Sequence, residues 1–179
     1  AVPERPLIEA DEHNQYLNFD LRLDNASDAA LELVRIELSV FDGRDRLVLR
    51  KFVWSSGAMS PGLLTVSDRQ LPPHGALGLF NPFFALDAGV PLDRLRYEFI
   101  LEPPGGGTRR TATLELRPIR YQPRVRLILP VDGPAIVYDG HEFYSHHRRI
   151  LVTSPRATER GFTTNPVRYA YDFAPVGPN

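Results

Sequence analysis

Leu31-Glu-Leu-Val-Arg-Ile-Glu-Leu-Ser-Val-Phe41 is the stretch that decides the fold, because apolar residues occupy every second position over most of its length. The apolar residues from Val34 to Val40 share one phase, which is the pattern of a β-strand with one buried face. Leu31 and Leu33 fall in the other phase. The alternation therefore predicts a β-bulge or a late strand start near Leu33.

The same alternation recurs on both sides of this stretch. It predicts further strands over residues 16–24, 47–54, 95–101 and 111–116. Asp42-Gly-Arg-Asp45 predicts the hairpin that joins 31–41 to 47–54. Groups of Gly, Pro and Ser at 55–57, 60–62, 71–75 and 81–82 predict turns, and Pro91 to Leu95 hints at a helical turn. Short strands at this spacing, about seven in all, predict a mainly β protein with an antiparallel, immunoglobulin-like β-sandwich.

A second unit follows a connector at Pro118–Pro123, where the strand pattern stops. Alternation resumes over 125–131 and predicts one more strand before Pro130 and Gly133 break the pattern. We therefore expect two domains. The first is a β-sandwich accessory domain over 1–118, and the second is an incomplete β unit over 124–179.

Composition excludes several classes of protein. The chain of 179 residues is 42% hydrophobic and 24% charged, as in ordinary globular proteins. A net charge of −1 argues against a nucleic-acid partner. The sequence contains no run of about 18 apolar residues, so no membrane span is predicted. Cysteine is absent, which excludes disulfides and thiolate metal sites. The start at Ala1–Pro6 predicts an exported protein, periplasmic or extracellular, whose signal peptide has been removed, although a trimmed chain would begin in the same way.

Three of the five histidines lie together in the stretch from Tyr138 to Arg149. They are His141, His146 and His147, and carboxylates stand nearby at Asp139, Glu142 and Asp172. Imidazole nitrogens and carboxylate oxygens are donors that suit zinc. If the stretch is a strand, His146 and His147 point to opposite faces and at most one of them binds a given ion, whereas His141 and His147 share a face.

A polar network is the structural alternative to a metal site. Arg148 and Arg149 could pair with the nearby carboxylates and brace a turn. A strand over 169–173 would place Asp172 opposite a row of aromatic residues, with Arg168 on its own side as a partner. The residues alone leave both interpretations open. The other two histidines, His13 and His74, lie in turn-like contexts, and we expect neither to be functional.

Two motifs together resemble a known family. They are Val137–Arg149, with Leu129-Pro130 and Gly133 before it, and Arg168–Phe173. They resemble the entry into the catalytic domain of lysostaphin-type zinc metallopeptidases, and more narrowly a bacterial exported subgroup with a β-sandwich in front. The resemblance covers about residues 127 to 173. It implies a zinc peptidase that hydrolyses peptide bonds, most plausibly in peptidoglycan.

The resemblance also implies roles for individual residues. Asp172 stands at the zinc-binding Asp, and Arg168 stands where the first zinc-binding His usually lies. In relatives with a long loop that His comes earlier, which points to His147, with His146 as second choice. His141, Arg168 and Asn165 are expected beside the ligands, and no residue is assigned as catalytic.

The family's later His-x-His pair has no counterpart between Asp172 and Asn179. Its second His is the third zinc ligand of the family, and its first His helps to activate water. We therefore expect this chain to be inactive alone, and to need the remainder of the metallopeptidase domain as a partner both for activity and for firm zinc binding. The alternative is a non-catalytic β-sandwich protein of the cell envelope that binds a protein or glycan, with a structural His/Arg network.

Overall fold

The structure, a computed structural model, describes residues 1–2, 5–54, 66 and 69–177. Strands take up 42% of these residues and helix 3%, in several antiparallel sheets with no closed barrel, so the chain is mainly β as its sequence predicts. It divides into two compact units, Ala1–Tyr121 and Gln122–Asn179. The turns predicted at 55–57 and 60–62 lie outside the described residues.

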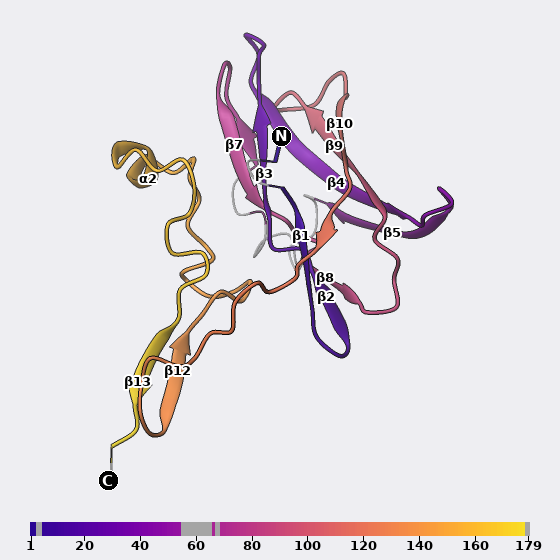
Figure 1. Ribbon diagram of the computed structural model, residues 1–179. Coiled ribbons are helices and arrows are strands. Elements are labelled where there is room, and N and C mark those ends of the chain that lie inside the picture. The colour runs from indigo at the N-terminus through magenta and orange to yellow at the C-terminus, as the bar shows by residue number, and fades with distance from the viewer. Residues whose placement is uncertain (3–4, 55–65, 67–68, 178–179) are drawn as a thin grey trace. The chain divides into compact units, whose positions relative to one another are not determined.

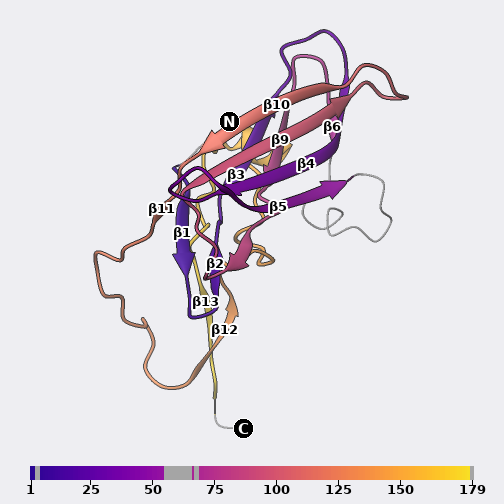
Figure 2. The ribbon, with the colours of Figure 1, turned by 90° about the vertical axis from the view of Figure 1, so that its right-hand side faces the viewer.

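One sheet of the first unit is built around residues 31–41, the stretch with the long apolar alternation. Its strands, in order, are β10 (Arg110–Leu116), β9 (Arg94–Glu102), β4 (Leu31–Phe41) and β5 (Leu47–Trp54), with β6 (Gln70–Leu71) paired to the start of β4 (Figure 2). The register of β4 against β9 shifts between Leu33 and Arg35, which confirms the predicted bulge. Since β9 begins at Arg94, the helical turn suggested over 91–95 is wrong.

The hairpin between β4 and β5 is held by a single carboxylate. Asp42 Oδ1 accepts the backbone N–H groups of Arg44 and Arg46, and its Oδ2 pairs with the Arg46 guanidinium. The Arg46 N–H, followed by the Arg46 side chain, holds the pKa of Asp42 below its ordinary value. The turn predicted at Asp42–Asp45 is therefore confirmed, and the Asp42 side chain stabilises it through hydrogen bonds within the turn.

Shorter strands make up the rest of the first unit. They are β1 (Leu7–Ala10), β2 (Asn14–Tyr16), β8 (Ala85–Asp87) and β11 (Ile119–Arg120) in one sheet, and β3 (Asp20–Asp24) with β7 (Ala76–Phe80) in another. Only β1 and β11 pair in parallel among these described strands. The segment 16–24, predicted to be a single strand, belongs to two strands. Extended pairing is interrupted at residues 17–19, where the Phe19 N–H donates to the Leu17 carbonyl.

A core fills the space between these sheets. It joins the inward residues of β4 and β9 to those of β3, β7 and the neighbouring segments. Its fully buried members include Leu17, Leu33, Ile36, Leu38, Val40, Leu95 and Tyr97, each 0% exposed. Two layers of mostly antiparallel strands around one apolar core form a sandwich-like fold.

The second unit has little regular structure in its described part. It contains β12 (Ala135–Asp139), β13 (Asp172–Pro175) and the short helix α2 (Pro155–Glu159), whose N-cap Ser154 accepts the Ala157 N–H (Figure 1). The strand predicted over 125–131 is wrong: no described strand pairs with it, and Leu127 is 85% exposed. A strand needs a neighbouring strand to pair with, and none of the described strands pairs with this segment. Pro123 and Pro130 also remove backbone hydrogen-bond donors at its two ends, which disfavours pairing.

Candidate metal centre

The site begins where β12 ends. β12 pairs with β13 in antiparallel fashion, and this register sets Asp139 opposite Asp172, with an irregularity between Val137 and Asp139 (Figure 1). Two carboxylates 33 positions apart in sequence are thus brought to the same end of a two-stranded sheet. The histidine-rich stretch starts directly after Asp139.

Residues 141–149 form a run of bends and turns, so the strand interpretation of this stretch is wrong. Asp139 supports the run, since its Oδ1 accepts the Gly140 N–H at 2.8 Å and its Oδ2 accepts the His146 N–H at 3.3 Å. The Glu142 carboxylate lies close to Gly140, 2.5 Å from where a Cβ would stand. A carboxylate that caps backbone donors favours a turn over an extended ladder.

This turn overturns the argument that His146 and His147 cannot serve one ion. Their ring centroids lie 4.3 Å apart, and His146 Nδ1 contacts Asp139 Oδ2. One donor atom each from Asp139, His146 and His147 lie within 4.8 Å of one another. The rule that neighbours face opposite ways holds for strands, and turn dihedrals do not obey it.

His147 is held in a defined orientation. Its ring Nδ1 donates to the Ala170 carbonyl at 3.2 Å, and its side chain is only 10% exposed. With the proton on Nδ1, the lone pair of a neutral ring is on Nε2, which lies 3.5 Å from Asp172 Oδ2. A ligand histidine commonly donates its other ring nitrogen to a backbone carbonyl in this way.

Asn165 lies beside His147. Its Nδ2 donates to the His147 carbonyl at 2.7 Å, and its Oδ1 accepts the Val167 N–H at 3.1 Å. Its amide therefore fastens the backbone of His147 to the segment that leads to β13.

His141 lies apart from the donor cluster. Its ring packs against Tyr171 and Tyr169, with centroid separations of 5.1 and 6.1 Å. The strand that would have put His141 and His147 on one face is absent. Arg168 is 6% exposed and lies in the turn 166–169. The sequence predicted a strand over 169–173 with Arg168 and Asp172 on the same side. This is wrong, because β13 begins only at Asp172.

Zinc fits the donors present. Two imidazoles and two carboxylates are ligand types that zinc takes, and the second ring nitrogen of His147 has the hydrogen-bond partner that such a ligand needs. Sequence reasoning named Asp139 among the carboxylates near the histidines and as a partner for arginine, and did not assign it as a ligand. Its closeness to both histidines depends on the turn, and no spacing rule in the sequence reveals it.

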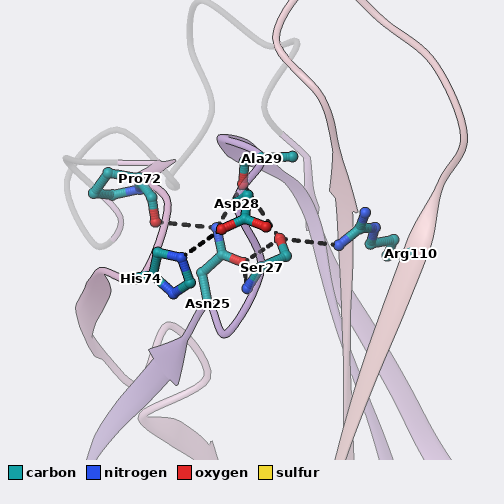
Figure 3. Close-up of polar contacts among 7 residues, drawn as sticks. All are labelled: Asn25, Ser27, Asp28, Ala29, Pro72, His74 and Arg110. Atoms are coloured by element: carbon teal, nitrogen blue, oxygen red, sulfur yellow. Dashed lines mark hydrogen bonds and ion pairs between the residues drawn. The ribbon is translucent and has the colours of Figure 1, made fainter.

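The other two histidines are outside this site. His13 lies in a bend of the first unit. Figure 3 shows His74 and Asp28 pointing toward each other, with 2.8 Å between His74 Nε2 and Asp28 Oδ1. Beside them Asn25 Nδ2 donates to the carbonyls of Ala29 and Pro72 (Figure 3). These contacts tie two loops together, which is a structural role.

No protein-family model matches the sequence, and no curated protein is significantly similar to it. Within the described residues, no helix has both the length and the apolar character needed to cross a membrane.

Proposed function

We propose that this chain is the amino-terminal part of an exported zinc metallopeptidase of the lysostaphin type. In this proposal a β-sandwich over 1–118 precedes residues 124–179, which begin the catalytic domain. One observation carries it: the ring of His147 is oriented by Ala170 so that its Nε2 faces the Asp172 carboxylate at 3.5 Å. These are the two residues that the family resemblance assigns to zinc.

The residues of this chain would bind and orient the metal. His147 donates from Nδ1 to the Ala170 carbonyl, which leaves its Nε2 to bind the ion, and Asn165 holds the backbone carbonyl of His147. The Asp172 carboxylate, 49% exposed, would supply a negatively charged ligand. Bound zinc would supply Lewis acidity, polarising a peptide carbonyl and acidifying water. The remaining ligand and the general base belong to the His-x-His pair of the family. We therefore expect the 179-residue chain alone to be inactive.

The proposed substrate is a peptide bond in peptidoglycan, which follows from the resemblance to exported bacterial members of the family. Because peptidoglycan lies outside the cytoplasmic membrane, this substrate places the protein in the periplasm or outside the cell. The sandwich would serve as an accessory module that positions substrate or restrains the site.

The test uses the coding sequence downstream of Asn179. If it continues into a His-x-His pair, the polypeptide that includes this pair should release soluble peptides from purified peptidoglycan. His147→Ala and Asp172→Ala should each lower the zinc content, and each should lower this activity by more than the roughly 100-fold loss typical of residues that only support a ligand. His13→Ala in the first unit is the matched control. Unchanged zinc content and activity in both variants would refute the proposal.

A non-catalytic envelope protein is the second candidate, and an exposed aromatic pair favours it. Phe52 and Trp54 on β5 are 58% and 41% exposed, with ring centroids 6.1 Å apart, and the Arg35 guanidinium lies 4.9 Å from the Trp54 ring centroid. Aromatic rings beside a cation are common in binding surfaces. This candidate predicts a chain that binds its partner without metal, and a coding sequence lacking the His-x-His pair would support it.

A further inference from the structure

The turn after β12 places donors beside His147 that the family resemblance does not assign as a set. Asp139, His146 and His147 each offer one donor atom, and these atoms lie within 4.8 Å of one another. Zinc holds imidazole nitrogen and carboxylate oxygen at about 2.0–2.2 Å, so donors of one ion lie within about 4 Å of one another. Closing the cluster on an ion needs a rearrangement of side chains, for which the 67% exposed His146 side chain has room.

Asp139 is fixed in place before any ion arrives. Its side chain is 12% exposed, and its Oδ1 is anchored by the Gly140 N–H, which leaves Oδ2 turned toward His146. A carboxylate largely withdrawn from water requires a positive partner. A divalent cation held between Asp139 and the two imidazoles meets that need.

Asp172 contacts the His147 ring from the opposite strand. The pairing of β12 with β13 brings it to the same end as Asp139, and its Oδ2 lies 3.5 Å from His147 Nε2. The donor atoms of Asp139, His146 and His147 lie together, and Asp172 contacts the ring of the same His147. This donor set suits zinc or cobalt, because imidazole favours such metals over magnesium or calcium.

We infer that Asp139 and His146 are metal ligands together with His147, so that the 179-residue chain holds one divalent transition-metal ion by itself. The inference rests on the proposed function for the place of the metal at His147. It departs from the expectation that this chain offers only two ligands and binds zinc weakly.

The experiment titrates the chelator-stripped 179-residue chain with Co²⁺, follows the visible absorption of the bound ion, and then displaces Co²⁺ with Zn²⁺. The wild-type chain should bind one equivalent, with the intense absorption of a four-coordinate site. Asp139→Asn keeps an oxygen for the Gly140 N–H but loses the second carboxylate oxygen, and it should weaken zinc binding by at least about 10- to 100-fold. His146→Gln should do the same, while Asp139→Glu should restore part of the affinity.

His13→Gln, at an exposed histidine of the first unit, is the matched control and should bind as the wild type does. Circular dichroism checks that each variant folds. If Asp139→Asn unfolds, the exposed His146→Gln decides the question. A wild-type chain that binds no Co²⁺, or Asp139→Asn and His146→Gln variants with wild-type zinc affinity, would overturn the inference.

Failure of this inference differs from failure of the proposed function. Loss of peptidoglycan hydrolysis in His147→Ala and Asp172→Ala, together with wild-type zinc affinity in Asp139→Asn and His146→Gln, would refute only the ligand assignment. Metal binding that depends on Asp139, His146 and His147, in a longer polypeptide that does not cleave peptidoglycan, would support the ligand assignment and refute the peptidase.

Discussion

At the scale of single residues, Tyr97 shows how a polar group is accommodated in the sandwich core. Its ring is 0% exposed, and its hydroxyl donates to Asn81 Oδ1 at 3.1 Å. Asn81 in turn donates from Nδ2 to the Leu17 carbonyl and accepts the Phe83 N–H. The pair thereby ties β9 to the break between β2 and β3. Burial raises the pKa of Tyr97 far above its ordinary value of 10.

Tyr97→Phe should lower the free energy of unfolding at neutral pH by about 1 kcal/mol, the typical net value of one buried hydrogen bond. A raised folded-state pKa contributes stability below pH 10, and this stability is lost as pH rises above 10, because only the unfolded state ionises there. The deficit of the variant should therefore shrink above pH 10. Urea unfolding at pH 7 and at pH 11 measures both effects, and a deficit that does not change with pH would contradict the assignment.

At the scale of the element, β5 lies at the edge of its sheet among the described strands, and it carries a charge that disfavours pairing with other chains. Lys51, the single lysine of the sequence, lies opposite Leu38 of β4 and so faces the side of the sheet that is otherwise apolar. Leu38 is 0% exposed, whereas Lys51 is exposed. An inward-pointing charge at a sheet edge disfavours addition of a further strand.

Lys51→Val should increase self-association of the chain, because it removes that charge and leaves an apolar strand with an open edge. Sedimentation velocity over a range of protein concentrations measures the effect. Lys51→Arg keeps the charge and should behave as the wild type does. If Lys51→Val and Lys51→Arg sediment alike at every concentration, Lys51 does not guard the edge.

At the scale of the whole molecule, burial is distributed unequally between the two units. The apolar core cluster is drawn from the first unit. In the described part of the second unit only Phe143 and Ala157 are buried apolar residues, while Leu127, Ile128 and Tyr138 are at least 79% exposed. Since apolar burial is the dominant stabilising term, the first unit has the means to fold alone and the second has little of its own.

A fragment of residues 1–121 should therefore unfold cooperatively, at a midpoint close to that of the first unit in the full chain. Calorimetry and near-UV circular dichroism measure this. A fragment of residues 1–117 is the matched comparison and should be less stable, because it lacks the pairing of β11 with β1 and the Arg120–Gln15 hydrogen bond. An unstructured 1–121 fragment would show that the first unit depends on the second.

The sequence alone determined the mainly β class, the strands β4 and β5 with their bulge and hairpin, and the residue types of the candidate site. Alternation of side chains and turn composition are local properties, and they are readable wherever a strand buries one face. They failed at 125–131, where the alternation has no partner strand, and at 141–149, where a capped turn replaces the strand. Only the tertiary structure brought Asp139 opposite Asp172 and turned His146 and His147 toward one position, because strand register and turn dihedrals depend on contacts distant in sequence.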